Sequence, residues 1–474
     1  MSSPFTEIDD LNGIWTALSN LDPEKKLTKI DMQRVSIAED SHLTVREAVN
    51  DLIGNKDGFK NAKITILSDK TPIYRGPNLL NELVLNQLYD FSNISFVELA
   101  SGNGVLHCDQ SVLEIATKAC AGSRLIITIG SGTITDIGKV AAGHNSYVPH
   151  IAIQTAASVD GFTDNVSIIL KDGVKRTVPS AWPSIVLADL KTIGSAPREM
   201  NLAGFGEAIS IFTGPADYQL SYLVGVEQNF HEASLKMLEA TASSPPDWAS
   251  GLATGDAHSI YNLIKLLALR GIVPGVSNTT ACLSGVEHTI SHMLDLYRGA
   301  KGLEIGLHGE QVGLGSVVAA RLWKEALEHD IIDPKRLKIP DMAEMNDRVK
   351  LVYEGLDEKG LIAAECWRDC KKKYKKVISN WPNLVKLVEG WKDNSRVFTT
   401  LVGDPLVLEN ALNSSGAPSS FSDLKFPVNK ELAIWAVTNC HLMRDRFTLV
   451  DLLDLLGLWS QERVNSSLKG LIGE

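Results

Sequence analysis

Short β-rich runs alternate with helical segments along the first 200 residues of this chain. Runs that read as buried strands are 62–68 (AKITILS), 94–99 (ISFVEL), 124–130 (RLIITIG) and 150–155 (HIAIQT). Segments with helical periodicity, such as 78–91 and 111–121, lie between them. Because parallel strands need crossover connections, this alternation predicts a parallel sheet covered by helices.

The pattern changes near residue 200. Beyond this point β-rich runs become scarce and long helical periodicities dominate, for example 259–270, 311–324 and 430–456. A chain of 474 residues is long enough for two domains. We therefore predict an α/β domain over residues 1–200 and an all-α domain over residues 201–474.

Composition excludes several classes of protein. With 44% hydrophobic and 22% charged residues, the chain is typical of soluble globular proteins. Its net charge of −11 argues against general binding to nucleic acid or anionic membranes, and no apolar run reaches the ~18 residues of a membrane span. Six scattered cysteines without a CxxC pair indicate reduced thiols, and the N-terminal residues lack a secretion signal. We therefore expect a cytoplasmic protein. The sequence does not determine the oligomeric state, and a homo-oligomer is one of the possibilities.

A glycine turn follows the third predicted strand. Gly130-Ser131-Gly132-Thr133 would open a helix, so its backbone N–H groups could face a pyrophosphate. The turn lacks the third glycine of GxGxxG, since Thr135 stands there, and it is no Walker P-loop. Taken alone, a tight connection without a ligand explains it equally well. Asp69, at the end of the first strong strand, is either a ribose acceptor or a turn residue.

Three distant segments offer one carboxylate and several imidazoles. Glu207 ends the run 204–207 (GFGE), His308 lies in 307–310 (LHGE), and His288 and His292 are one helical turn apart. A carboxylate with two imidazoles is a familiar ligand set for a catalytic divalent metal. The protease signature HExxH is absent, because the glutamate precedes His288. Spacing alone does not show that these groups converge, and an isolated HxxxH is more often structural.

Several motifs occur in one order along most of the chain. They are 130–139 (GSGTITDIGK), 155–161 (TAASVDG), 172–177 (DGVKRT), 203–207 (AGFGE), 284–292 (SGVEHTISH), 307–313 (LHGEQVG) and 443–448 (MRDRFT). Together they resemble the sn-glycerol-1-phosphate dehydrogenases. That family belongs to a superfamily with the iron-containing alcohol dehydrogenases, glycerol dehydrogenase and dehydroquinate synthase.

The resemblance implies an α/β nucleotide domain, a helical domain, and a cleft that holds NAD or NADP and one divalent metal, usually zinc. It implies Glu207, His288 and His308 as metal ligands. Asp160 would lie near the metal and substrate, and His292 beside the nicotinamide and substrate. The implied cofactor-binding residues are Gly130, Ser131, Gly132, Thr133, Asp136, Lys139, Thr155 and Ser158, to which Asp69 is added as a candidate from its place at the strand end. Lys175 and Arg176 are candidates for a substrate phosphate, although a hairpin with solvent-facing charges would look the same.

Two departures from the family pattern bear on the reaction. The family dehydrogenases have aspartate where this chain has Glu207, whereas dehydroquinate synthases have glutamate there. The usual Ser-Arg-Pro-x-Ser-Gly is replaced by 277–285 (SNTTACLSG), without the arginine. The leading hypothesis is an NAD(P)-linked, metal-dependent reduction of dihydroxyacetone phosphate to sn-glycerol 1-phosphate. The alternatives are a dehydroquinate-synthase-like lyase that uses NAD transiently, and a catalytically degenerate nucleotide-binding protein.

Overall fold

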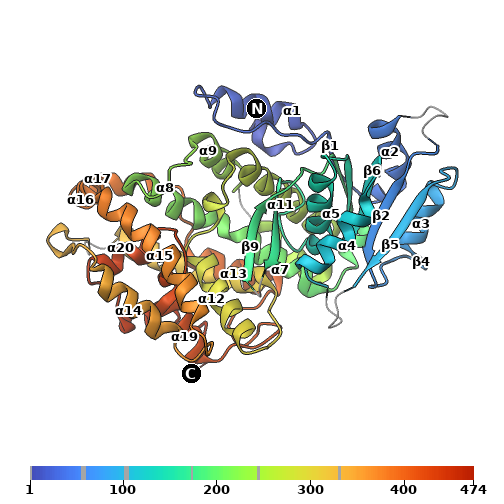
Figure 1. The fold of residues 1–474 in the computed structure, drawn as a ribbon. Coiled ribbons are helices and arrows are strands. Elements are labelled where there is room, and N and C mark those ends of the chain that lie inside the picture. The colour runs from blue at the N-terminus through green and yellow to red at the C-terminus, as the bar shows by residue number, and fades with distance from the viewer. Residues whose placement is uncertain are drawn as a thin grey trace. The chain divides into compact units, whose positions relative to one another are not determined.

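The computed structural model describes residues 3–54, 60–100, 106–171, 174–242, 246–328 and 332–473, with the side chains of 171, 174, 175 and 246 left out. The chain forms two compact units (Figure 1). Unit 1 comprises Met1–Gly204 and Ser250–Asn278, and unit 2 comprises Phe205–Ala249 and Thr279–Glu474.

Unit 1 contains a parallel sheet. Among the described residues six strands pair in the order β1-β10-β7-β6-β2-β5, and every neighbouring pair is parallel. The strands are β1 (Arg34–Ala38), β2 (Ile64–Asp69), β5 (Ile94–Leu99), β6 (Leu125–Gly130), β7 (His150–Gln154) and β10 (Ile185–Asp189). The predicted α/β fold is confirmed, and the four predicted strands are β2, β5, β6 and β7. The chain adds two strands that were not predicted, β10 beside β7 and β1 beside β10.

Helices cover both faces of this sheet, which explains why its strands read as continuous apolar runs. Leu125, Ile127 and Ile129 of β6 pack in one buried cluster with α2 (Val45–Ile53) and α3 (Leu80–Gln87). Ile126 points to the opposite face and packs with α4 (Gln110–Cys120) and α5 (Gly132–His144). Alternate residues of one strand therefore enter two separate cores.

The segment Ser250–Asn278 returns to unit 1, whereas a single helical domain over 201–474 was predicted. Its helix α11 (Ala257–Ser277) is buried along most of its length. Gly271 lets α11 pack closely against the backbone of Asp160, since a Cβ at Gly271 would lie 2.3 Å from the carbonyl oxygen of Asp160. By length and composition α11 could cross a membrane, but 83% of its most apolar window is buried inside the protein. Helical periodicity identifies such a helix without showing which core it joins.

In the described residues of unit 2 the regular elements are all helices, joined by loops (Figure 1). Its longer helices include α8 (Gly214–Val224), α12 (Val286–Ala300), α13 (His308–Glu328), α15 (Leu361–Ser379) and α19 (Lys430–Asn439). The segment predicted as one helix over 430–456 is two helices, α19 and α20 (Leu449–Leu455). The break has a local cause: Thr448 and Asp451 form a capping box that starts α20.

Candidate active site

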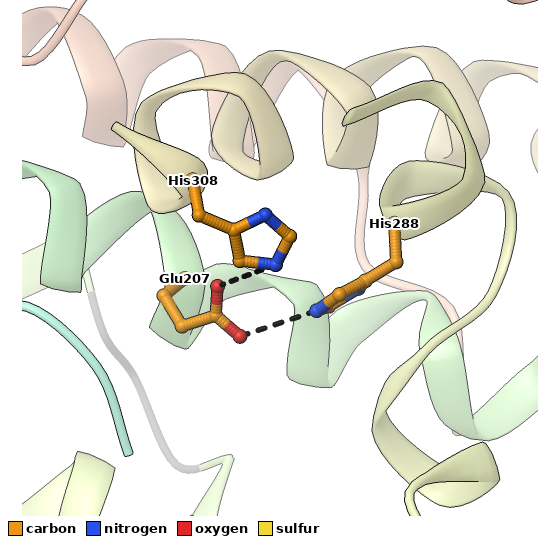
Figure 2. Close-up of side chains that lie close together, drawn as sticks. All are labelled: Glu207, His288 and His308. Atoms are coloured by element: carbon orange, nitrogen blue, oxygen red, sulfur yellow. Dashed lines mark hydrogen bonds and ion pairs between the residues drawn. The ribbon is translucent and has the colours of Figure 1, made fainter. Parts of the chain in front are cut away.

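Glu207, His288 and His308 converge within unit 2, from three different helices (Figure 2). Glu207 is near the end of α7 (Arg198–Ile209), His288 is in the first turn of α12, and His308 begins α13. The Glu207 carboxylate lies 3.2 Å from Nε2 of His288 and 3.7 Å from Nε2 of His308. One potential ligand atom from each residue lies within 4.8 Å of the other two. The structure thus brings together the three predicted ligands.

Close packing of two helix backbones places Glu207 beside His308. A Cβ on Gly206 would lie 2.1 Å from the carbonyl oxygen of Gly309 and 3.3 Å from Cα of Gly313. Only glycine permits such an approach between α7 and α13. The glycine immediately before Glu207 therefore sets the distance between this carboxylate and the first turn of α13.

The His288 ring is held by its sequence neighbour. Nδ1 of His288 lies 3.0 Å from Oε1 of Glu287, which is fully buried. Glu287 also accepts hydrogen bonds from the N–H of Gly285 at 2.6 Å and the Thr213 hydroxyl at 2.9 Å. A carboxylate so placed accepts a hydrogen bond from Nδ1–H and favours the tautomer whose Nε2 lone pair is available to an ion.

The His308 ring is oriented in a similar way by neutral groups. Nδ1 of His308 lies 2.9 Å from the hydroxyl of Ser291, and that hydroxyl donates to Oε1 of Gln311 at 2.7 Å. Since the Ser291 proton is directed to Gln311, its oxygen accepts from Nδ1 of His308. The Nε2 lone pair of His308 then faces Glu207 and is available to a cation.

The electrostatics of this cluster favour positive charge. Burial alone would lower the pKa of His288, but the carboxylates of Glu207 and Glu287 outweigh it and raise that pKa above its ordinary value. Two imidazole Nε2 atoms and a carboxylate, with both Nδ1 atoms hydrogen-bonded, match the donor set of a catalytic divalent metal. The residues present fit such an ion.

His292 lies beside this cluster. Its ring centroid is 5.4 Å from that of His308 and 6.4 Å from that of His288. His292 also forms a second group of potential ligands with Asp295 and His308. It is therefore within the same site without belonging to the first set of three ligands.

Asp160 belongs to unit 1 and faces a buried arginine there. Its carboxylate lies 3.2 Å from a guanidinium nitrogen of Arg270, which is on α11 and is 1% exposed. The hydroxyl of nearby Thr163 donates to the carbonyl of Ala268 at 2.7 Å on the same helix. Asp160 is thus anchored to α11 inside unit 1.

The glycine turn lies at the point where the strand order of unit 1 reverses. The chain passes from β2 outward to β5, then returns to the other side of β2 for β6 and continues to β7. In open α/β sheets, nucleotides bind at the carboxyl ends of the strands at such a switch point. Asp69 ends β2 and Gly130 ends β6. Ser131 precedes α5 without capping it through its side chain, so the first N–H groups of α5 suit a phosphate.

Lys139 does not face this turn as a phosphate ligand would. It is fully buried, and its ammonium lies 2.6 Å from Asp164, 2.9 Å from Asp136 and 2.7 Å from the carbonyl of Gly161. Burial would lower the pKa of Lys139, but the two carboxylates raise it above its ordinary value. Asp136 also accepts from the N–H of Ile168 at 3.0 Å. Lys139 and Asp136 therefore support the turn through contacts within the protein.

The other predicted cofactor residues lie at or near the same strand ends. Asp69 accepts a hydrogen bond from the N–H of Thr71 at 2.9 Å, as a turn residue does, and stays partly exposed. The N–H of Thr155 donates to the carbonyl of Gly130 at 3.1 Å, so the segment after β7 adjoins the glycine turn. Ser158 and Thr133 are partly buried.

The two candidate phosphate ligands lie on a hairpin. Strands β8 (Val166–Lys171) and β9 (Val174–Pro179) pair antiparallel, and β9 carries both Lys175 and Arg176. The side chain of Lys175 lies outside the described part of the chain, and Arg176 is partly buried. The hairpin agrees equally with a phosphate site and with a solvent-facing turn.

Sequence reasoning missed the residues that orient the ligands. Glu287, Ser291, Gln311 and Asp295 were not singled out, although Glu287 directly precedes His288 and Ser291 directly precedes His292. It also missed how the altered loop after α11 is held. Arg446 donates to the carbonyl of Ser284 at 2.9 Å and to the hydroxyl of Thr280 at 2.6 Å.

The chain is similar to known dehydrogenases in sequence. A family model described as iron-containing alcohol dehydrogenase matches residues 45–197. A glycerol-1-phosphate dehydrogenase (NAD(P)+) of Bacillus velezensis is 27% identical over 324 residues, which are 68% of this chain and 68% of that protein. A protein of the same name from Pyrococcus furiosus is 28% identical over 60% of this chain and 78% of its own length.

A solved structure agrees in fold. The probable glycerol dehydrogenase from Sinorhizobium meliloti has a TM-score of 0.54 at 15% identity, covering 91% of this chain and 97% of that one. The sequence relatives do not favour the lyase or the degenerate alternative, because they carry dehydrogenase names.

Proposed function

We propose a function from the premise that this chain belongs to the iron-containing alcohol dehydrogenase superfamily and is similar in sequence to glycerol-1-phosphate dehydrogenases. It is an NAD(P)-dependent dehydrogenase that acts on a CH–OH group. The observation that carries the proposal is the convergence of Glu207, His288 and His308 within unit 2.

Glu207, His288 and His308 would hold one divalent ion, and we propose zinc. When bound, such an ion supplies Lewis-acid polarisation of a carbonyl oxygen. With an ion bound, Nδ1–H of His288 would donate to Glu287 and Nδ1–H of His308 to Ser291, which would leave both Nε2 lone pairs to the ion. These residues thus pre-organise the site.

The reduction adds a hydride from NADH or NADPH to the carbonyl carbon and a proton to its oxygen. His292 is the residue we assign to the proton, since imidazole titrates near neutral pH and its ring lies next to His308. The nucleotide would bind at the switch point of unit 1, with its pyrophosphate at Gly130–Gly132 and its ribose at Asp69. Asp160, held by Arg270, is proposed to position the substrate.

The proposed substrate is dihydroxyacetone phosphate, reduced to sn-glycerol 1-phosphate. The names of the relatives support this choice, and the cationic residues Lys175 and Arg176 on β9 are the proposed phosphate ligands. The protein would act on a small molecule in the cytoplasm, where the six cysteines, all buried and in no disulfide, would stay reduced.

The test incubates the protein with NADH or NADPH and dihydroxyacetone phosphate, and follows the nicotinamide absorbance. Net consumption of reduced nucleotide supports the dehydrogenase. Release of phosphate from a sugar phosphate without net nucleotide consumption would instead indicate a lyase. The variant His308→Ala should lose both the metal and turnover, measured by elemental analysis and by the same assay. Full metal occupancy in this variant would remove His308 from the ligand set.

A further inference from the structure

His308 stands between two imidazoles that face it from α12. Its ring centroid is 5.3 Å from that of His288 and 5.4 Å from that of His292, whereas those two are 6.4 Å apart. His308 is also shared by two groups of potential ligands. One is Glu207, His288 and His308, and the other is His292, Asp295 and His308.

The second group has the chemistry of a divalent-cation site. His292 and Asp295 are three residues apart on α12, so both side chains leave the same face of that helix. Asp295 is 6% exposed, and one ligand atom from each of the three residues lies within 4.8 Å of the other two. Two imidazoles and a carboxylate repeat the donor types of the first group.

The charge around the three rings also favours a cation. Three carboxylates, Glu207, Glu287 and Asp295, surround three imidazoles and are all buried. A neutral imidazole has one unprotonated ring nitrogen, so His308 can bind only one ion at a time. Because both groups need His308, they are alternatives and would not be filled together.

We propose that unit 2 contains a second position for a divalent cation such as Zn²⁺ or Co²⁺, formed by His292, Asp295 and His308. His308 is common to both positions, so one ion binds either with Glu207 and His288 or with Asp295 and His292. An ion on the second side engages His292 and withholds it from proton transfer, so that position is unproductive. This inference rests on the proposed metal site, but it concerns residues that the first ligand set does not use.

The test measures cation stoichiometry instead of turnover. Metal-free protein is dialysed against buffered Co²⁺, and bound metal is quantified together with its visible absorption spectrum. Wild type should hold one ion, and so should Glu207→Gln and Asp295→Asn. Glu207→Gln should show a changed Co²⁺ spectrum, because its ion has moved. The double variant Glu207→Gln/Asp295→Asn and the single variant His308→Ala should hold none.

A matched control is Glu310→Gln. Glu310 is a buried carboxylate on α13 that accepts from the N–H of Lys425 at 3.0 Å and is in neither ligand group. It should keep one ion with the wild-type spectrum. Folding of every variant is checked by circular dichroism and thermal unfolding.

The outcomes separate the two proposals. If wild type binds one ion and folded Glu207→Gln binds none, the second position is excluded while the first stands. If the folded double variant still binds an ion, Asp295 is not a ligand and the inference fails. If wild type binds no ion, the metal site itself is wrong, and the second position is excluded with it.

Discussion

The glycine contact between α7 and α13 gives the most direct test of how this fold builds its site. In Gly206→Ala the new Cβ would lie 2.1 Å from the carbonyl oxygen of Gly309. Ordinary contact needs about 3.4 Å, so the two helices must separate by about 1.3 Å or distort. Glu207 is the next residue, and its carboxylate would move with its helix away from His308.

A displacement of this size exceeds what the site tolerates. Metal–ligand distances vary by only ~0.2 Å, and a misplacement of about 1 Å can lower a reaction rate by ~10²-fold. Overpacking of a buried contact costs about 1–3 kcal/mol. We therefore expect Gly206→Ala to lose most of its bound metal, to lower kcat/KM by about 10²-fold, and to unfold at lower denaturant concentration.

The matched control is Gly299→Ala. Gly299 is on α12, the helix that carries His288, and a Cβ there would meet nothing within 4 Å. This variant should keep its metal and activity and gain stability by about 0.5–1 kcal/mol from helix propensity. Metal content is measured by elemental analysis, stability by urea unfolding, and activity by nucleotide absorbance. Wild-type metal content and stability in Gly206→Ala would refute the argument that this contact sets the ligand distance.

Three further predictions test other parts of the molecule. Gly132→Val adds a branched side chain where a Cβ would already lie 2.6 Å from Val159, so the Kd for NAD(P)H should rise by about tenfold or more. The Kd is measured by nicotinamide fluorescence, and an unchanged Kd would mean that the turn only connects β6 to α5. His292→Asn should lower kcat by about 10²–10⁴-fold and keep its metal, and wild-type kcat would remove His292 from proton transfer. Burial lowers the pKa of His150 to about 3 in the folded protein, from ~6.5 in the unfolded chain. Neutral His150 therefore adds to the free energy of unfolding above pH ~6.5, and this addition is lost as the pH falls. Wild type should therefore lose about 2 kcal/mol of unfolding free energy between pH 7 and 5 that His150→Gln does not lose, and equal losses in urea titrations would contradict this assignment.

Local patterns predicted much of unit 1 because its strands are buried on both faces. Runs such as 124–130 are apolar at consecutive positions, and each face of β6 meets a different set of helices. The same reasoning did not place α11. Helical periodicity predicts a helix over 259–270, but the partners of that helix are set by contacts such as Arg270 with Asp160, which are more than a hundred residues apart. Domain membership is therefore decided by tertiary packing that no local pattern contains.

The site divides in the same way between local and long-range causes. The pair His288 and His292 follows from helical spacing, and Glu287 could have been added because it is adjacent to His288. The meeting of Glu207 with His308 depends instead on Gly206, whose missing side chain lets α7 approach α13. In the sequence this glycine looks like an ordinary weak point of a helix. Its role becomes visible only from its contacts with Gly309 and Gly313 in the folded protein. A set of metal ligands on separate helices therefore depends on the glycines that let those helices approach as much as on the ligand residues themselves.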